Sequence, residues 1–544
     1  MSNLNKDILH TIFEELQDDG NSLYNLLSVD IVWSETIIPI LWRNPWKYFN
    51  DKKNETISRE EIKRFLLNDK KKRSLLDVII SHLSNEIRDT FKLTTIYEKP
   101  LFNYIGYCKH LNLSDLEEII NIMEYEELDV YNEIFNLFIN EKMRITHLYI
   151  PRQFDYQLHL IPGVENCLLG LEYFRCSTLT KDDVLVGLAE ICKSIKELNF
   201  NIYNHEGRED YNYDNVTENG IVKLIQRQKK LNKVHFYYGE SMYMRTTNSN
   251  SLYKSLENSL IGHAKNIQYF SANKKPFTNI LSSFKNLKSL EICGDYYSSI
   301  HGQPNFFPNF FSPYSLPSLP PLPPLPPLPP LSSLQILKAR DIPINDLISL
   351  FESSKGLCEI KIEYSTIDIE HGKRIIQAIY ENCPNLKYLG IPFNKSCILE
   401  LEKLLIKCQF LEGLYLNIGE ENCEEIFKTL ARSSPNSLFK FKFEFKFQTN
   451  RFKRISLMSF KLFLHYWQGK HPMLLQTIGM SLNKSDEHSY LIENYKFLGV
   501  IKKYDDIELG KNNFKDFEWI KQIPFHETSL DGNIANRTRR IYMI

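Results

Sequence analysis

A short apolar pattern recurs along this 544-residue chain and constrains its fold more than any other feature. The pattern is apolar-x-x-apolar-x-apolar, and five of its starts, at 334, 357, 386, 411 and 438, lie 23, 29, 25 and 27 residues apart. Each copy is typical of a short strand whose alternate residues point inward. Because one copy cannot bury its own apolar side, the recurrence favours stacked units. The copies are ITHLYI (145–150), LEYFRC (171–176), IKELNF (195–200), LNKVHF (231–236), NIQYFSA (266–272), LKSLEI (287–292), LQILKA (334–339), LCEIKI (357–362), LKYLGI (386–391), LEGLYL (411–416), LFKFKF (438–443) and LQTIGM (475–480).

The intervals between these copies predict helices, because they carry apolar residues at i, i+3, i+4 spacing. Examples are DDVLVGLAEICKSI (182–195), GKRIIQAIYENC (372–383), LELEKLLIKC (399–408) and CEEIFKTLA (423–431). The spacing and the LxxLxL core resemble irregular leucine-rich repeats with a helix in each unit. This resemblance implies an α/β fold, a curved solenoid over 145–523 with parallel strands on its concave face and helices outside. For the segments between 200 and 290, an ordinary α/β domain is the alternative.

Two regions beside the copies predict different kinds of structure. Residues 46–144 are mostly helical in pattern, as in SLLDVIISHL (74–83), and we expect a helical connector that covers the apolar end of the first repeat. Residues 304–331 include PSLPPLPPLPPLPPL (317–331), which excludes helix and central strand and favours extended polyproline II. This proline-rich loop matches the ligands of WW-like grooves, and a low-complexity insertion without a partner is the alternative. Residues 524–544 are expected to form a flexible tail.

The first 45 residues form a separate apolar segment. Leu4, Ile8, Leu9, Ile12, Phe13 and Leu16 recur at helical spacing, and further apolar residues from Leu23 to Trp42 continue the pattern. Three short helices contain too little material to bury so many large side chains on both sides. We therefore expect part of this surface to remain available to a partner, with an unrelated helical cap on the solenoid as the alternative.

The same segment resembles an F-box, in the run L-x-x-D-I-L-x-x-I-F-x-x-L followed by L-x-x-L-x-x-V-x-x-x-W and a closing L-W. Two positions depart from that family's pattern: Asn5 stands where proline is usual, and Asp30-Ile31 replaces the usual Cys-Arg pair. Asn5 remains a suitable residue to cap a helix. The resemblance implies that residues 1–45 bind a Skp-type adaptor of a cullin-RING ubiquitin ligase. The implied adaptor-binding residues are Leu4, Asn5, Ile8, Leu9, Ile12, Phe13, Leu16, Leu23, Leu26, Val29 and Trp33.

An F-box followed by leucine-rich repeats implies a substrate-recognition subunit, in which the repeats bind an unknown target protein for ubiquitin transfer. A non-degradative interaction scaffold is the alternative. In either case the chain is expected to contribute no catalysis of its own. Substrate contacts are expected at polar positions between the inward residues of each strand, and a merely solvated face is the alternative for any one of them. These positions are Tyr149, Arg175, Asn199, His235, Glu291, Lys338, Lys361, Tyr415 and Lys442.

Charge, cysteine content and motifs narrow the remaining function classes. Lys and Arg number 66 against 67 Asp and Glu, so no net positive charge favours nucleic acid or an anionic membrane surface. The 10 cysteines form no CxxC pair or zinc-ligand spacing, which favours free thiols in a reducing compartment and no bound metal. We find no secretory signal, no apolar stretch long enough to cross a bilayer, and no phosphate-binding, metalloprotease or hydrolase motif. These observations predict a cytoplasmic or nuclear protein without a cofactor.

Overall fold

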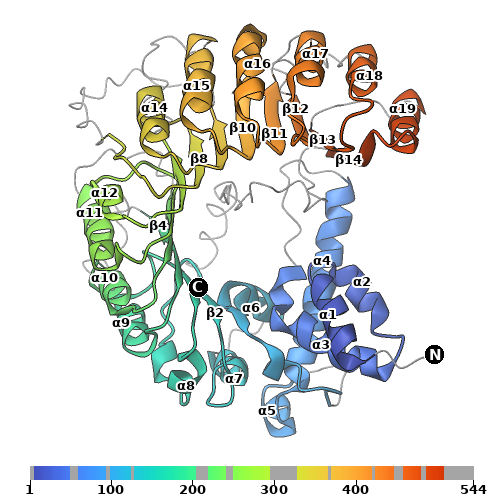
Figure 1. Ribbon diagram of the computed structural model, residues 1–544. Coiled ribbons are helices and arrows are strands. Elements are labelled where there is room, and N and C mark those ends of the chain that lie inside the picture. Colours follow the sequence, from blue (N-terminus) through green and yellow to red (C-terminus); the bar gives the residue numbers. More distant parts are fainter. Residues whose placement is uncertain are drawn as a thin grey trace, which may run out of the picture. The chain divides into compact units, whose positions relative to one another are not determined.

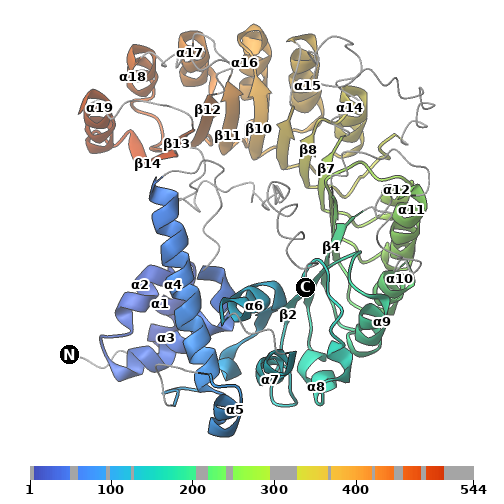
Figure 2. The same cartoon turned by 180° about the vertical axis from the view of Figure 1, so that it is seen from behind.

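The computed structural model describes residues 5–48, 59–93, 99–123, 128–203, 218–239, 249–294, 327–364, 369–418, 423–445, 457–478 and 486–507. The chain divides into two compact units. The first comprises Met1–Leu287 with Ser318–Pro329, and the second comprises Lys288–Pro317 with Pro330–Ile544. In both units a layer of helices lies against one side of a set of strands (Figures 1 and 2).

The first unit begins with three short helices, α1 (Lys6–Glu15), α2 (Gly20–Leu26) and α3 (Ile31–Arg43). Each starts at a polar side chain that accepts a hydrogen bond from a backbone N–H two or three residues ahead: Asn5, Asp19 and Asp30. Asn5 therefore caps α1 as the sequence suggests. The three helices share a small core made of Leu9, Phe13, Leu23, Ile37 and Ile40.

Further helices follow in the range predicted as a connector. These are η1 (Pro45–Tyr48), α4 (Arg59–Ser81), α5 (Asn85–Thr90), η2 (Ile105–Tyr107), α6 (Leu113–Ile120), η3 (Asn121–Met123) and α7 (Leu128–Phe138). Trp46 joins the N-terminal helices to the sheet, because it is buried and its indole Nε1 donates to the His110 carbonyl at 2.6 Å. The Lys109 backbone N–H donates to the Arg43 carbonyl at 3.0 Å. These contacts fix the end of α3 against the first strand.

Six described strands of the first unit run parallel in chain order. They are β1 (His110–Asn112), β2 (His147–Tyr149), β3 (Tyr173–Ser177), β4 (Glu197–Ile202), β5 (Lys233–Tyr238) and β6 (Tyr269–Ala272). The helices between or after them are η4 (Leu158–Leu160), α8 (Val164–Leu168), α9 (Asp182–Ile191), α10 (Glu218–Arg227), α11 (Ser249–Ser259), η5 (Leu260–His263) and α12 (Ile280–Ser283). The repeat pattern between 200 and 290 thus forms parallel strands in the order that the solenoid interpretation predicts.

The sheet starts earlier than the predicted boundary at 145. Strand β1 lies within the range assigned to the connector and pairs parallel with β2. The sequence CKHLNL (108–113) carries the repeat pattern with cysteine in its first position, and Cys108, Leu111 and Leu113 are fully buried. A small apolar thiol fills this position as a leucine does elsewhere.

The second unit repeats the arrangement over eight described strands, again parallel. They are β7 (Ser289–Cys293), β8 (Ile336–Arg340), β9 (Glu359–Glu363), β10 (Tyr388–Phe393), β11 (Gly413–Ile418), β12 (Lys440–Phe445), β13 (Met473–Ile478) and β14 (Ile501–Ile507). The helices are α14 (Ile344–Ser353), α15 (Ile369–Asn382), η6 (Lys395–Cys397), α16 (Ile398–Lys407), α17 (Glu424–Ser433), α18 (Leu457–Tyr466) and α19 (Asp486–Phe497). Figure 1 shows α14 to α19 side by side along one side of β8 to β14.

The last predicted copy, LQTIGM (475–480), has the wrong register. Leu475 pairs with Phe441 and Thr477 pairs with Phe443, so the repeat pattern starts three residues earlier, at Pro472. Thr477 is fully buried at a position that an apolar residue occupies in other copies, and its hydroxyl lies 2.9 Å from that of Tyr504. A polar residue with a buried partner breaks the apolar pattern without breaking the fold.

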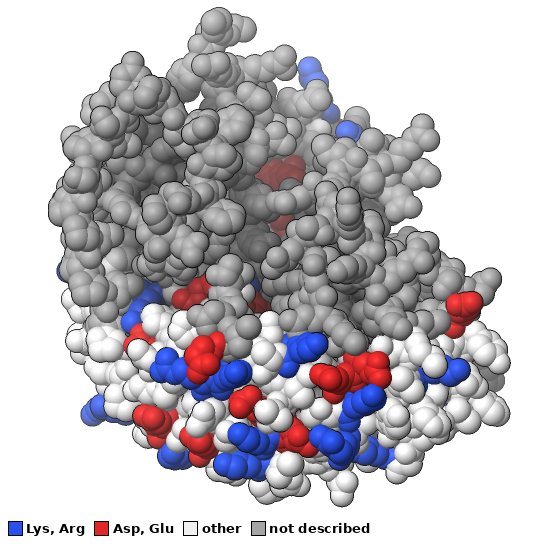
Figure 3. Space-filling view, turned by 90° about the horizontal axis from the view of Figure 1, so that it is seen from above, with Lys and Arg blue, Asp and Glu red and all other residues white. Residues whose placement is uncertain are grey.

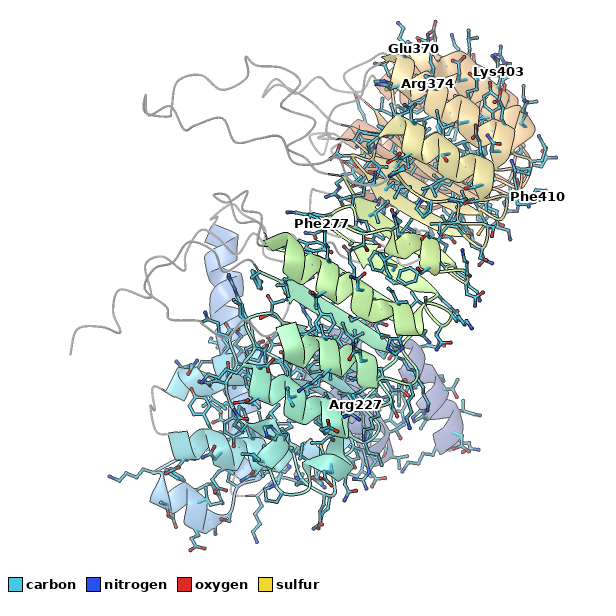
Figure 4. All side chains as sticks on the ribbon, turned by 90° about the vertical axis from the view of Figure 1, so that its left-hand side faces the viewer. Arg227, Phe277, Glu370, Arg374, Lys403 and Phe410 are labelled. Atoms are coloured by element: carbon cyan, nitrogen blue, oxygen red, sulfur yellow. The ribbon has the colours of Figure 1, made fainter. Side chains whose placement is uncertain are left out.

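The helix layers are held together by apolar packing, with polar pairs between neighbouring helices at their surface. Arg227 of α10 pairs with Glu190 of α9 at 3.0 Å, and Arg374 of α15 donates to Asn345 of α14 at 3.0 Å (Figure 4). Such exposed pairs contribute about 0–1 kcal/mol each. Burial of the repeat leucines and phenylalanines therefore dominates the stability of both units.

Two parts of the predicted domain plan lie wholly or mostly outside the described residues. The tail 524–544 and all of the proline-rich loop except 327–331 are outside them, so the WW-like partner stays a prediction. The structure also divides the predicted solenoid range, since the boundary between the compact units falls at Leu287 and Lys288. Among the described residues, no helix combines the length and apolarity needed to cross a membrane.

Candidate functional site

Two surfaces carry the predicted binding residues, and the first lies on the N-terminal helices. Ile8 and Ile12 are 50% and 45% exposed and share one side of α1, because they are four residues apart. Large apolar side chains are also exposed at the start of α3, where Ile31 is 66% exposed. We call Ile8, Ile12, Val29, Ile31 and Val32 the N-terminal apolar face.

Contacts between α1 and α3 bring the members of this face onto adjoining helices. The Lys6 ammonium lies 3.2 Å from the Glu35 carboxylate, and the rings of Phe13 and Trp33 lie edge to face at 5.3 Å. Toward the other end of α1, Arg43 donates to Glu14 at 3.1 Å. This hydrogen bond and the charge of Arg43 lower the pKa of the Glu14 carboxyl. The geometry of the face is therefore fixed at both ends of α1.

The structure separates the predicted adaptor-binding residues into three groups. Asn5, Ile8, Ile12 and Val29 are exposed, and Leu16, Leu26 and Trp33 are half-buried. Leu9, Phe13 and Leu23 are at most 3% exposed in the small core, so they support the face without being accessible to a partner. Leu4 lies outside the described residues. The sequence interpretation missed Ile31 and Val32, which follow the Asp30 cap and are apolar at the open start of a helix.

The second surface is the side of the strands that faces away from the helices. In the first unit, cross-strand register aligns one residue of each strand into a row, which we call the first-unit row. Four predicted substrate contacts are therefore direct neighbours. The row consists of Asn112, Tyr149, Arg175, Asn199, His235 and Ser271.

His235 is held in place by groups from its own and two other strands. Its Nε2 lies 3.0 Å from a carboxylate oxygen of Glu197, and its ring lies 4.8 Å from that of Tyr269. Lys233 lies 3.3 Å from the same carboxylate. Burial opposes ionisation of Glu197, but its bonds to His235 and Lys233 outweigh burial and lower its pKa. In the neutral imidazole, an Nε2–H that donates to Glu197 leaves His235 Nδ1 as an acceptor.

Three polar atoms in the first-unit row are buried and have no hydrogen-bond partner among the described residues. They are Asn199 Oδ1, His235 Nδ1 and Ser271 Oγ, on residues that are 8%, 4% and 1% exposed. A buried polar atom left without a partner costs roughly 1–3 kcal/mol. Arg175, half-buried beside Asn199, forms no hydrogen bond or ion pair within the part of the chain that the structure describes. The row therefore contains one cation and three polar atoms without a hydrogen-bond partner in the described chain.

The second unit has a corresponding row of aligned residues, and charged side chains at or beside it form ion pairs. Glu291 lies 3.6 Å from Lys338, and Glu363 lies 2.5 Å from Lys361 and 2.6 Å from Arg340. Burial opposes ionisation of Glu363, but the two cations outweigh it and lower its pKa to about 2. The row, which we call the second-unit row, consists of Glu291, Lys338, Lys361, Gly390, Tyr415, Lys442, Gln476 and Asp505.

Tyr415 occupies the centre of the second-unit row. Its hydroxyl donates to Glu444, and the ammonium groups of Lys442 and Lys361 lie 5.3 Å and 5.8 Å from its ring centroid. Burial and the Glu444 charge raise the pKa of Tyr415. Three of the five predicted contacts of this unit, Lys361, Tyr415 and Lys442, thus belong to one network, and the other two, Glu291 and Lys338, pair with each other.

Within the ranges that the structure describes, other residue groups offer no further site of this kind. Among the described residues, no cluster of three His, Cys, Asp or Glu could hold a metal ion. The ten cysteines are free, and burial raises the pKa of Cys108 to about 12, which makes it a poor nucleophile. On the face shown in Figure 3, the described surface intersperses acidic and basic side chains without a patch of one sign.

Comparisons with known proteins yield weak similarity only. No family model matches the chain, and no curated protein matches it. The leucine-rich repeat-containing protein LegL7 from Legionella pneumophila is 12% identical, with a TM-score of 0.28, over 56% of this chain and 84% of that protein. A protein from Bacteroides fragilis is also 12% identical, with a TM-score of 0.27, over 66% of this chain and 82% of that protein.

Scores of this size do not establish a shared fold. The assignment of the fold comes from the chain itself: parallel strands, a repeating apolar register and a layer of helices in each unit. These features are those of a leucine-rich-repeat type of α/β array, an architecture that presents an extended surface for protein–protein interaction.

Proposed function

We propose that this protein is a substrate-recognition subunit of a Skp-cullin-F-box ubiquitin ligase. In this proposal α1 to α3 bind a Skp-type adaptor, and the strand face of the array binds a target protein. The protein itself performs no chemistry. It raises the effective concentration of a target lysine near a separately recruited ubiquitin-conjugating enzyme. Such a role places it in the cytoplasm or the nucleus.

The observation that carries the proposal is the division of α1 into two apolar sides. Leu9 and Phe13 pack in a core that α1 to α3 complete by themselves, while Ile8 and Ile12 remain exposed. Large apolar side chains are also exposed at the start of α3, the helix that packs against α1. Apolar area removed from water by a partner stabilises a complex by about 25 cal/mol per Å² before the costs of association. A protein partner with an apolar groove or helix fits such a face.

The test measures the affinity of the purified full-length chain for a purified Skp-type adaptor by calorimetry. The variants are Ile8→Asp and Val32→Asp, each in the first turn of a helix, where a carboxylate is favourable for the helix itself. The matched control is Leu160→Asp, because Leu160 is 70% exposed elsewhere in the first unit. Leu9→Asp is unsuitable because it would charge the core.

We expect each of the two face variants to weaken adaptor binding at least about tenfold, as the loss of a central apolar contact does. The control is expected to bind as the unmodified chain does. Absence of adaptor binding by the unmodified chain, or binding that is insensitive to both face variants, would refute the proposal.

A second candidate is a non-degradative interaction scaffold whose N-terminal helices cap the array. The contacts of Trp46 with His110 and of Arg43 with Lys109 favour it, because they join α3 and η1 to the first strand as a cap does. Cellular abundance of bound proteins separates the two candidates. A substrate receptor predicts that its bound proteins accumulate when Ile8→Asp replaces the unmodified chain, whereas a scaffold predicts unchanged abundance.

A further inference from the structure

The first-unit row contains one cation that is not engaged in an ion pair within the described chain. Arg175 is half-buried, and within the described chain it makes no hydrogen bond or ion pair. A guanidinium has five N–H donors in a planar fork that matches carboxylate and phosphate oxygens. Its neighbours in the row, Tyr149 and Asn199, are uncharged. The position therefore favours a ligand group with negative charge.

The neighbouring strands add a second, independent observation. Within the described chain, Asn199 Oδ1 and, in the neutral imidazole, His235 Nδ1 are acceptors without donors, and Ser271 Oγ also has no partner there. The three residues follow Arg175 on consecutive strands. Buried acceptors without partners indicate a missing donor. A ligand that supplies N–H or O–H groups as well as negative charge would satisfy these atoms, whereas a simple inorganic anion would not.

Distance and charge define the ligand further. From Arg175 to Ser271 the row crosses three gaps between strands, about 14 Å in total, which about four extended residues can span. Two acidic groups, Asp115 on α6 and Glu197 on β4, lie near enough to affect ionisation around the row. One cation between two carboxyl groups does not favour a polyanion such as a nucleic acid.

We propose that the first-unit row is a subsite for an extended peptide of a partner protein with one acidic side chain. Arg175 binds the carboxylate or phosphate of that side chain, and Asn199 and His235 accept N–H groups of the peptide. This deepens the proposed function by naming the class of target segment. It rests on that function only in taking the bound protein to be the target.

The test uses the full-length chain and degenerate peptides whose central residue is fixed as Glu, phosphoserine, Ser or Lys. Retention of each peptide library on the immobilised protein is measured. The variants are Arg175→Gln and Arg175→Lys. The control is Arg227→Gln, the same substitution on α10, where Arg227 pairs with Glu190 on the helix layer (Figure 4).

We expect the Glu or phosphoserine library to be retained about tenfold more than the Ser and Lys libraries. The relative retention of the Glu and phosphoserine libraries identifies the source of the anion. Arg175→Gln is expected to abolish the preference, Arg175→Lys to keep part of it, and the control to leave it unchanged. No preference for acidic peptides, or a preference that survives Arg175→Gln, would overturn the proposal.

The proposed binding of the adaptor can be tested independently of the proposed peptide subsite. Ile8→Asp changes the N-terminal apolar face and leaves the row intact, so the peptide preference is expected to persist in that variant. Adaptor binding is likewise expected to persist in Arg175→Gln. A protein that prefers acidic peptides but binds no adaptor would contradict the ligase role and leave the subsite standing.

Discussion

The two rows share one backbone geometry and differ in how their charges are balanced. In the second unit, Glu363 meets both Lys361 and Arg340, and Tyr415 meets Glu444. In the described part of the first unit, Arg175 has no such partner, and a polar atom of Asn199, of His235 and of Ser271 has no hydrogen-bond partner. Gln476 Oε1 is the comparable unmet atom of the second-unit row. Polar groups that pair with one another within a row contribute to the stability of the fold. Polar groups that lack such partners can instead form hydrogen bonds or ion pairs with a ligand.

The largest expected effect is on stability in the second unit. Glu363→Gln removes the anion between two cations, and we expect the free energy of unfolding of that unit to fall by about 1–2 kcal/mol. The value lies below that of a fully buried pair because Glu363 is 29% exposed. Hydrogen exchange of the β8 to β10 strands measures it. Unchanged exchange there would show that the network does not stabilise the unit.

Asp115 and Glu117 of the first unit and Glu363 of the second unit are also expected to change stability with opposite signs when the pH falls. Burial raises the pKa of Asp115 to about 6 and of Glu117 to about 7 in the first unit, whereas the pKa of Glu363 is lowered to about 2. A raised pKa means that the folded state binds more protons than the unfolded state, so stability increases as pH falls from about 7 to 4. The lowered pKa of Glu363 means that its contribution is lost from about pH 4.5 to pH 2.

Hydrogen exchange at a series of pH values checks this contrast. Between pH 7 and 5, protection of β2 to β4 is expected to rise, and Asp115→Asn is expected to reduce that rise. Below pH 4.5, protection of β8 to β10 is expected to fall, less so in Glu363→Gln. If protection of β2 to β4 and of β8 to β10 changed in the same direction over both pH ranges, the proposed contrast would be wrong.

A smaller effect is expected on peptide affinity. Asp115 affects Arg175 electrostatically, so Asp115→Asn removes a competing negative charge from its surroundings. We expect acidic peptides to bind about two- to threefold more tightly to this variant at neutral pH and low salt, with the gain shrinking as salt increases. Fluorescence anisotropy of the best-retained labelled peptide measures the change. Weaker binding would indicate that Asp115 helps to position the site.

The smallest effect is expected for Arg175 on stability. Because Arg175 has no partner within the described chain, Arg175→Gln leaves no group newly unpaired. We expect a change of less than about 0.5 kcal/mol in the free energy of unfolding. Thermal unfolding of Arg175→Gln, measured in parallel with that of Glu363→Gln, compares the two changes in stability. A loss as large as that of Glu363→Gln would mean that Arg175 has a structural role.

The sequence predicts the strand positions well because their apolar register repeats. Arg175, Asn199 and His235 occupy the same place in successive copies, and the structure pairs them across neighbouring strands. The first strand was missed because Cys108 stands in place of leucine, and the last copy was misplaced because Thr477 is polar. Periodicity predicts which residues share a side, but it does not identify a buried polar residue whose partner is distant in sequence.

On the N-terminal helices, the sequence predicts which residues are apolar and share a side of a helix. It does not predict which of them lie in the core and which are exposed. Leu9 and Ile8 are adjacent in the chain, yet one is in the core and the other is 50% exposed. The division depends on how α1 packs against α3, which is a property of tertiary structure. The pairing of charges on the strands is likewise a property of tertiary structure. Whether Glu363 or Arg175 has an ion-pair partner depends on the residues of neighbouring strands.

The most direct test of the account is hydrogen exchange of the full-length chain with and without a purified Skp-type adaptor. The account predicts new protection at α1 and at the start of α3, around Ile8, Ile12 and Val32, with unchanged exchange of β3 to β5. Absence of a complex, or protection that appears only on the strands, would contradict it.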